Sequence, residues 1–391
     1  MSLNKAVCSF KILEEWVIDV NMTGIIFSNI YDAYMGDLTK HRTLASLPFG
    51  GRYRLIDFVL SNMSNSGVDN VGIITKYNYQ SLLDHLGSCE EWDMSRKNAR
   101  VFVLPPFGTG QTNVYQGKLE ALYGALQFLK RTKEDYILMS DCNVICNIDY
   151  DLVFREHIRS GAQLTVIANR EEPAYEDEIR DFVISTDDDG MVTDVTIRHP
   201  FTRENLCGMG MFIVEKSLLV SAVEEAVAHG RYHFERDFVQ REFLNGRLSL
   251  NVYEFKGCVL RNRDIQSYFK NNCRMLEEEV RRDIFDPQNP IYTKVRDEVP
   301  TYYDQSAEVD DCLVADGCRI EGKVSDSILF RNVTVEAGAV VEHAIVMQGT
   351  VVRAGANVRY AILDKDVEIS EGRTLIGSDR APVIIQKGER I

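Results

Sequence analysis

One loop near the start of the sequence carries residues that bear on phosphate binding. It follows the apolar run Ile25–Phe27, a predicted buried strand, and contains Asn29, Ile30, Asp32 and Tyr34. In nucleotide-binding α/β folds, the loop after the first strand uses glycines to bring backbone N–H groups close to phosphates. Here Asp32 places a carboxylate near any bound phosphate, and no cation in the loop neutralises it. The sequence therefore predicts that this loop has lost the residues with which such loops bind phosphate.

Predicted strands and helices alternate around this loop. Val71–Thr75, Tyr136–Met139 and Leu164–Ile167 are predicted to be strands, and Leu119–Leu129 has apolar residues at helical spacing. From residue 22 to about residue 255, this alternation predicts an α/β domain with a mostly parallel, Rossmann-like sheet covered by helices on both faces. Ligands of such sheets bind at the carboxyl ends of the strands, where the loop begins.

The periodicity changes in the last part of the chain. Ala337-Gly338, Ala354-Gly355 and Glu371-Gly372 recur seventeen residues apart, and valines between them step by six. Steps of six residues grouped in threes are typical of a β-helix. A β-sandwich is the alternative, but its strands alternate with a period of two. We therefore predict a left-handed parallel β-helix.

Length and composition exclude several classes of function. A chain of 391 residues has room for two or three domains, and its net charge of −15 argues against general binding of nucleic acid or anionic membranes. The nine cysteines form no CxxC pair, which favours reduced thiols in a cytoplasmic protein. No run of eighteen apolar residues occurs and charges interrupt the N-terminal stretch, so neither a membrane helix nor a signal peptide is expected.

A longer motif identifies a family. The run Pro48–Phe58, followed by Leu60–Asn62 and Asn65–Gly67, closely resembles ADP-glucose pyrophosphorylases (glucose-1-phosphate adenylyltransferases), and further matches continue along most of the chain. The resemblance implies a nucleotidyltransferase domain followed by a left-handed β-helix of hexapeptide repeats. We accordingly divide the chain into an N-terminal extension without assigned function (1–21), a nucleotidyltransferase-like domain (22–269), a charged linker (270–305) and a β-helix domain (306–391).

The resemblance implies that the family's phosphate cradle, GGxGxR, is degenerate here. Its three glycines and its arginine are replaced by Asn29, Ile30, Asp32 and Tyr34. A β-carbon at a position that requires positive φ costs about 1–2 kcal/mol, which indicates that the cradle is lost. The family's lysine falls at Leu44, although Lys40 and Arg42 lie nearby.

The base-reading and magnesium sites of the family are also altered. The base-reading stretch resembles Val103–Pro106, but Phe107 and Gly108 replace paired glutamines that could discriminate a base. The first magnesium aspartate falls at Asp141 in a gapped register and at Asn143 in an ungapped one. Arg261 replaces the second aspartate, and a cation there repels a metal ion. We expect Arg261 to form an ion pair with Asp141 that closes the vacant site.

The sugar side is changed in part. His199 falls at the family's phosphate-binding lysine and is mostly neutral at pH 7, so a surface histidine in a turn is the better interpretation. Substrate-binding positions are retained, as vestiges, at Gln116, Gly117, Gly208, Gly210 and Asp237. Charged residues replace small ones beside them, namely Lys118 after Gly117 and Glu235 before Asp237.

Phosphate, metal, base and sugar sites are thus altered together, while the residues that build the fold persist. The resemblance implies a regulatory, catalytically weak or inactive subunit in a heterotetramer with a catalytic paralogue, which makes ADP-glucose from ATP and glucose 1-phosphate for glycogen synthesis. No catalytic residue and no cofactor are assigned. A phosphorylated-metabolite effector is expected around the interface of the two domains.

Two alternatives stay open. The chain could be an active sugar-1-phosphate nucleotidyltransferase that requires magnesium and uses displaced groups, namely Lys40, Arg42, Asp141 and Asp264. It could also be a hexapeptide-repeat acyltransferase with His343 as its base. The second alternative leaves the nucleotidyltransferase motifs unexplained.

Overall fold

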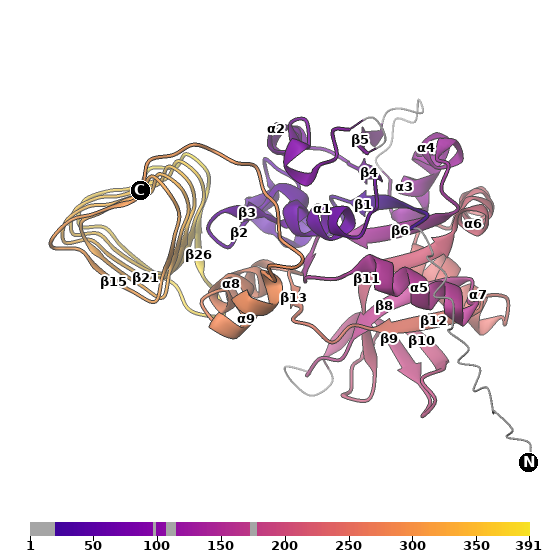
Figure 1. Ribbon diagram of the computed structural model, residues 1–391. Coiled ribbons are helices and arrows are strands. Elements are labelled where there is room, and N and C mark those ends of the chain that lie inside the picture. Colours follow the sequence, from indigo (N-terminus) through magenta and orange to yellow (C-terminus); the bar gives the residue numbers. More distant parts are fainter. Residues whose placement is uncertain (1–19, 97–98, 107–114, 173–177) are drawn as a thin grey trace, which may run out of the picture.

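The computed structural model describes residues 20–96, 99–106, 115–172 and 178–391 (Figure 1). An α/β domain built on one large sheet is followed by a triangular coil of short parallel strands that lies beside it. The predicted fold class is therefore confirmed. Phe107 and Gly108 of the base-reading stretch lie outside the described residues. No described helix combines the length and the apolar character that crossing a bilayer requires.

One half of the central sheet is parallel. In spatial order its strands are β5 (Arg100–Leu104), β4 (Asn70–Ile74), β1 (Met22–Phe27) and β6 (Tyr136–Asp141). Every residue of β1 is buried because both faces of the sheet are covered. Ile25 packs with Leu119 in the core on one face. Ile26 packs with Val59 on the opposite face.

The other half of the sheet is mixed, a feature that the alternation of elements did not predict. Its strands are β8 (Leu164–Asn169), β9 (Ile179–Thr186), β10 (Val192–Pro200), β11 (Leu206–Glu215) and β12 (Leu250–Glu254). β11 is antiparallel to β6, β8 and β9, whereas β12 is parallel to β8. Residues 187–191 join β9 to its antiparallel neighbour β10, and so short a turn cannot join parallel strands.

Helices cover both faces of the sheet (Figure 1). They are α1 (Leu55–Asn65), α2 (Gln80–Leu86), α3 (Lys118–Gly124), α4 (Leu126–Arg131), α5 (Tyr150–Ser160), α6 (Lys216–Ala228) and α7 (Arg241–Leu244), with the single turn η4 (Glu90–Trp92). α1, α2 and α5 supply one apolar core, and α3, α4 and α6 supply the other. β1 and β6 are neighbours and end at Phe27 and Asp141, so their carboxyl ends meet at the same edge of the sheet.

Two helices and an irregular segment connect the domains. α8 (Ile265–Arg274) and α9 (Glu278–Ile284) precede residues 285–301, which form neither helix nor strand. The boundary placed at residue 269 falls inside α8. Tyr268 of α8 shares one apolar cluster with Phe49 of the first domain and Ile345 of the second. A hydrophobic core therefore joins the two domains.

The C-terminal domain is a parallel β-helix with three faces (Figure 1). One face consists of β14 (Tyr302–Tyr303), β17 (Arg319–Ile320), β20 (Thr334–Val335), β22 (Val351–Val352) and β24 (Glu368–Ile369). The other faces consist of β15 (Glu308–Asp310), β16 (Leu313–Val314), β18 (Lys323–Ser325), β19 (Ile328–Leu329), β21 (Val340–Val346), β23 (Asn357–Leu363), β25 (Thr374–Ile376) and β26 (Val383–Ile385). Val335, Val352 and Ile369 stack in register and are fully buried, as the seventeen-residue repeat predicts.

Candidate functional site

The loop after β1 does not have the conformation of a glycine-rich cradle. It is folded into the 3-10 turns η1 (Asp32–Tyr34), η2 (Gly36–Thr39) and η3 (Leu44–Ser46). None of Asn29, Ile30 and Asp32 has a positive φ. The loop therefore follows a different path from that of a glycine-rich cradle, one that residues with side chains adopt readily.

Side chains of this loop occupy the donors that a phosphate would need. Oδ1 of Asp32 accepts the backbone N–H of Leu44 at 2.7 Å, and Oδ2 accepts the side-chain amide of Asn29. Oδ1 of Asn29 accepts the N–H of Lys76 at 2.9 Å. Burial raises the pKa of Asp32 to about 6, although both hydrogen bonds oppose the shift. Tyr34 is exposed and offers no charge in place of the family's arginine.

An ion cluster centred on Lys118, the first residue of α3, lies at the carboxyl ends of β1 and β6, a region that we call the cleft. Its Nζ lies 2.8 Å from Oδ2 of Asp141 and 2.5 Å from Oε1 of Glu235, in the π-helical segment η6 (Phe234–Gln240). Burial would lower the pKa of Lys118, but the two carboxylates raise it, so the ammonium stays charged. Burial raises the pKa of Asp141 to about 6, against the effect of Lys118.

The residues present do not fit a magnesium ion. The ammonium of Lys118 already occupies the cation position beside Asp141, which is buried at 1% exposure. Asn143 is also buried, and its carbonyl oxygen accepts the N–H of Asn262 at 2.7 Å. Within the described ranges, no group of three or more His, Cys, Asp or Glu side chains is arranged to hold a metal. The ammonium of Lys118 already binds the carboxylates of Asp141 and Glu235, which a divalent ion would need as ligands here.

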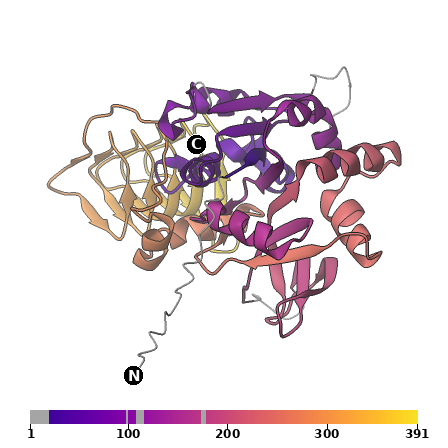
Figure 2. The ribbon, with the colours of Figure 1, turned by 45° about the vertical axis from the view of Figure 1, so that its right-hand side comes forward.

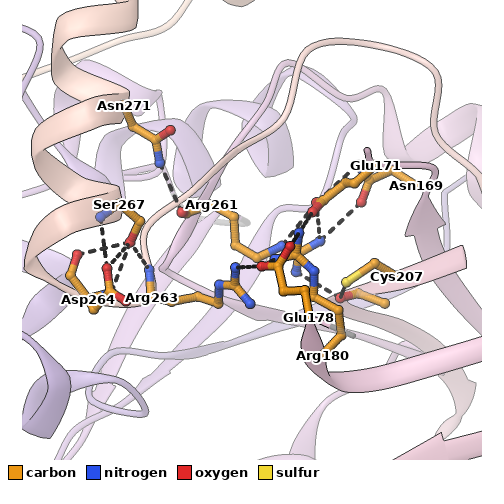
Figure 3. A network of polar contacts seen from close by, with 11 residues as sticks. Asn169, Glu171, Glu178, Arg180, Cys207, Arg261, Arg263, Asp264, Ser267 and Asn271 are labelled. Atoms are coloured by element: carbon orange, nitrogen blue, oxygen red, sulfur yellow. Dashed lines mark hydrogen bonds and ion pairs between the residues drawn. The ribbon is translucent and has the colours of Figure 1, made fainter. Parts of the chain in front are cut away.

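Arg261 forms a second ion network in the cleft (Figure 3). It lies on the two-residue strand β13 (Leu260–Arg261), which pairs with β7 (Val144–Ile145). Nη1 of Arg261 donates to the carbonyl oxygen of Gly208 at 2.8 Å. Nη2 lies 3.0 Å from Oε1 of Glu171. The guanidinium thus bridges the ends of β8 and β11.

The predicted ion pair between Arg261 and Asp141 is wrong. The guanidinium of Arg261 is bound by Glu171, and the carboxylate of Asp141 is bound by Lys118. Each of the two side chains is therefore held by a partner other than the predicted one. Further arginines extend the network, as Arg180 lies 3.0 Å from Glu171 and 3.1 Å from Glu178, which also binds Arg263 at 3.1 Å.

Gly210 and Gly117, two of the retained glycines, lie where no side chain fits against the neighbouring atoms. A β-carbon on Gly210, which has φ of +70°, would lie 2.4 Å from Oδ2 of Asp141. A β-carbon on Gly117 would lie 2.2 Å from the carbonyl oxygen of Tyr232. Both distances are far below van der Waals contact. The persistence of these glycines therefore has a structural explanation that does not require a substrate.

The other sequence-predicted positions have local partners. The backbone N–H of Gln116 donates to Glu120 at 2.7 Å, and the Asp237 carboxylate accepts the N–H groups of Tyr232 and His233. Burial would raise the pKa of Asp237, but its hydrogen bonds, the one from Arg236 foremost, lower it.

His199 is exposed on β10, with Nδ1 2.9 Å from the carbonyl oxygen of Pro200. No hydrogen bond or ion pair among the described residues joins it to the Lys118 or Arg261 networks.

The groups named for the alternative functions are also engaged. Lys40 donates to Gln386 at 3.0 Å, and Arg42 forms a buried, bidentate pair with Asp364 at 2.7 and 2.8 Å. Asp264 accepts the N–H of Ser267 at 2.8 Å and so caps α8. His343 stacks on Tyr360 with ring centres 4.7 Å apart. Each of these interactions has a structural role.

The base-reading stretch lines a pocket. Leu104, Pro105 and Pro106 border about 350 Å³ of free space, together with Tyr115 and Ala121 of the opposite wall. The hydroxyl of Tyr115 has no hydrogen-bond partner in the described part of the chain. Glu120 also lines this space, which is therefore partly polar.

A second pocket lies between the domains and is strongly basic. It contains about 430 Å³ of free space, including its open mouth. Its basic side chains come from the first domain, the connector and the β-helix, and they are Arg52, Arg54, His85, Lys294, Arg296, Arg331 and Lys365. Among the described residues, no carboxylate lies within 4.0 Å of the charged nitrogens of these lysines and arginines. The pocket therefore has the charge to hold a phosphate group.

Burial of these charges without carboxylate partners shifts their titration. Nε and Nη2 of Arg331 are buried and have no hydrogen-bond partner among the described residues. Burial, reinforced by Arg54 and Arg42, lowers the pKa of Lys365 to about 7. Burial also lowers the pKa of Arg54 to about 10. An anion in the pocket would stabilise all of these cations.

Sequence reasoning missed both the Lys118 cluster and the residues of the basic pocket. Lys118 and Glu235 were noticed only as departures from the family pattern. Both replace small residues of the family, and their charges are opposite. That combination was the signal from which an ion pair between them could have been predicted. The pocket had no such signal, since its members are separated by up to about three hundred residues.

Comparison with known families agrees with this architecture. Residues 35–256 match the family described as nucleotidyl transferase, and residues 298–382 match the family described as GlmU-like, C-terminal hexapeptide. The fold and the remodelled cleft thus define a protein of the nucleotidyl transferase class that carries a hexapeptide-repeat domain.

Similarity to individual proteins identifies the family within this class. Glycogen biosynthesis protein GlgD of Bacillus subtilis is 32% identical over 367 residues, which cover 94% of this chain and 96% of that protein. GlgD of Geobacillus stearothermophilus is 33% identical over 82% of each chain. Glucose-1-phosphate adenylyltransferase of Clostridioides difficile is 30% identical over 83% of this chain and 85% of that protein. The chain belongs to the family of glucose-1-phosphate adenylyltransferases and GlgD proteins, as its motifs predicted.

Proposed function

We propose that this protein is a regulatory, catalytically weak or inactive subunit that assembles with a catalytic glucose-1-phosphate adenylyltransferase. The partner makes ADP-glucose from ATP and glucose 1-phosphate for glycogen synthesis in the cytoplasm, and the assembly is a heterotetramer. The observation that carries the proposal is the Lys118 ammonium bound between Asp141 and Glu235. In the register that keeps Asp141 as the magnesium aspartate, this ammonium takes the place of the metal ion.

The chemistry explains why this replacement matters. Magnesium bridges phosphate oxygens and holds water in an octahedral shell, and it neutralises charge as the phosphate bond breaks. An ammonium group carries one charge, and here it is already shared by two carboxylates. Arg261 adds a cation at the second metal position, paired with Glu171. Neither group can orient a triphosphate for attack.

The basic pocket supports a regulatory role. Its unpaired cations suit a phosphorylated metabolite, whose oxygens would bind Arg331, Arg54 and Lys365. Lys365 follows Asp364, whose pair with Arg42 ties the β-helix to the loop after β1. An effector in the pocket would thus act on a contact between the domains and bias the conformation offered to the catalytic partner.

Co-expression tests the proposal. The catalytic paralogue from the same genome is purified alone and together with this chain, and ADP-glucose formation and mass are measured with and without phosphorylated effectors. A hetero-oligomer with altered kinetics is expected. The proposal fails if neither mass nor kinetics changes. It also fails if this chain alone releases pyrophosphate from ATP and glucose 1-phosphate with magnesium, since that result would support the active alternative.

A further inference from the structure

The chain between α9 and the β-helix crosses from one domain to the other. Figure 2 shows residues 285–301 of this segment, in orange, and they form neither helix nor strand. We call residues 290–296 the strap. Within the strap Ile291 is partly buried, whereas Tyr292 is 36% exposed and Val295 is 63% exposed. Segments with few buried apolar contacts detach at low free energy, so the position of the strap depends largely on its polar contacts.

Helix α1 presents a stripe of polar side chains to the strap. Asp57, Ser61 and Asn65 are spaced four residues apart, so they share one face of the helix. Nδ2 of Asn65 donates to the carbonyl oxygen of Pro290 at 3.0 Å. Oγ of Ser61 accepts the backbone N–H of Tyr292 at 2.8 Å. The strap therefore runs antiparallel to α1 and reaches Asp57 last.

Asp57 joins the strap to the wall of the basic pocket. Its side chain is fully buried, and Oδ2 accepts the hydroxyl of Thr293 at 2.6 Å and the backbone N–H of Arg54 at 2.9 Å. Oδ1 lies 2.5 Å from Nε2 of His85 in α2. His85 and Arg54 both line the pocket. One buried carboxylate thus binds the strap with one oxygen and a pocket residue with the other.

The C-terminal end of the strap is itself part of the pocket. Lys294 and Arg296 line it together with Arg331 and Lys365 of the β-helix. Nζ of Lys294 also donates to the carbonyl oxygen of Asp84 in α2 at 2.7 Å. The strap therefore cannot leave α1 without moving two of the cations that line the pocket.

The charges of the pocket act on the strap. Burial and then the nearby charges of Arg52 and Arg296 lower the pKa of Arg331. The cation of the strap and that of the β-helix thus oppose each other across the pocket. An anion between them would replace this repulsion with two attractions. Binding of an anion would therefore stabilise the strap on α1, and its release would loosen it.

We propose that the strap is a conformational switch that an anion in the basic pocket closes. In the closed position residues 290–296 lie on α1, where Asp57 binds Thr293 and His85 together. Because β14 follows the strap in the chain, loosening the strap also loosens the link between the two domains. This inference rests on the proposed function, which assigns a phosphorylated effector to the pocket, and it adds the element that responds.

Hydrogen exchange measured by mass spectrometry tests the proposal on the full-length chain, with sulfate as the anion. Peptides that cover residues 290–296 should exchange about three- to tenfold more slowly when sulfate is present at ten times its dissociation constant. Peptides of α6, which packs on the opposite face of the sheet from α1, are the internal reference and should not change.

A substitution that removes no charge tests the contact with α1. Thr293→Val loses the hydrogen bond to Asp57, so exchange of the strap without sulfate should rise about threefold or more. The matched control is Thr301→Val, which loses a hydrogen bond of 2.7 Å to the carbonyl oxygen of Ala315 in the β-helix. This control should leave exchange of the strap unchanged. Circular dichroism establishes that each variant is folded.

The outcomes separate the two proposals. If sulfate does not bind the parent chain, the effector assignment fails and the switch fails with it. If sulfate binds and exchange of the strap stays the same, the effector assignment stands and only the switch is wrong. Equal acceleration by Thr293→Val and Thr301→Val would also overturn the switch, since the effect would not depend on Asp57. The measurement on the parent chain needs no substitution, so it decides the question even if a variant is unstable.

Discussion

The cleft at the end of the central sheet and the pocket between the domains are both rich in cations, but they compensate them differently. In the cleft, Lys118 and Arg261 are bound directly by carboxylates. In the pocket, Arg331 and Lys365 have no carboxylate within ion-pair distance among the described residues. One region is closed by its own side chains, and the other presents charges to a ligand.

This difference indicates which of the two regions is arranged to bind a ligand. An unpaired buried charge is costly, and it persists where something outside the chain compensates it. Buried charges that pair with each other need no ligand. We therefore expect substitutions in the cleft to change stability, whereas substitutions in the pocket should change anion binding.

The largest expected effect is on Lys118. Lys118→Met leaves Asp141 and Glu235 without their shared cation, so the free energy of unfolding should fall by about 3–5 kcal/mol. Urea denaturation at pH 7 measures the change. In the control, Lys130→Met removes an exposed pair with Glu224 and should cost about 1 kcal/mol or less. Equal losses in the two variants would contradict the assignment of a buried ion cluster.

A smaller effect is expected from the carboxylate of the former phosphate loop. The pKa of Asp32 rises from 3.8 to about 6 on folding, so the folded chain holds its proton more tightly between these values. The free energy of unfolding should therefore fall as pH rises from about 4 to about 6, by about 2–3 kcal/mol. Asp32→Asn should remove this part of the pH dependence, which denaturation at several pH values would detect.

Asp37→Asn is the matched control for this variant, since it changes an exposed carboxylate of the same loop. It should keep the parent pH profile. An Asp32→Asn profile parallel to the parent's between pH 4 and pH 6 would show that Asp32 is not the group that titrates.

Arg331→Met tests the opposite region. Sulfate affinity, measured by calorimetry, should fall about tenfold because a charge-assisted donor is lost. The free energy of unfolding without sulfate should stay within about 0.5 kcal/mol or rise, since the side chain is buried without partners. Arg319→Met, on the exposed outer face of the β-helix, should leave sulfate affinity unchanged. A large loss of stability for Arg331→Met would remove the contrast between the regions.

The smallest effect concerns Lys365. Its pKa is lowered to about 7, so it loses its charge as pH rises through neutrality. Because sulfate remains a dianion in this range, its affinity for the pocket should fall by about three- to tenfold between pH 6 and pH 8. Lys365→Arg should flatten this dependence. A parent profile independent of pH would mean that Lys365 does not face the bound anion.

The fold was largely predictable because local periodicity encodes it. The fully apolar run of β1 and the seventeen-residue repeat of the β-helix each identify an element without reference to distant residues. The mixed half of the sheet was not predictable in this way. The antiparallel pairing of β11 with β6 depends on contacts between residues about seventy positions apart.

For the candidate site, the sequence predicted which of the family's binding residues are replaced, but not the contacts that the replacing residues make. The motif register placed Asn29, Asp32 and Arg261 at altered positions, but it could not supply their new partners. Lys118 binds Glu235, 117 residues further along the chain, and Arg261 binds Glu171 across 90 residues. The prediction that Arg261 pairs with Asp141 is wrong for this reason. Alignment to the family places both cations, Lys118 and Arg261, near Asp141, but it does not determine which of them binds the carboxylate.

The apolar cluster that contains Phe49, Tyr268 and Ile345 has a thermodynamic consequence. Removing the β-helix would expose one wall of this cluster to water, and removing α8 would expose both walls. The two halves of the molecule should therefore lose their structure together, as one calorimetric event, and neither half expressed by itself should retain the stability that it has in the intact chain.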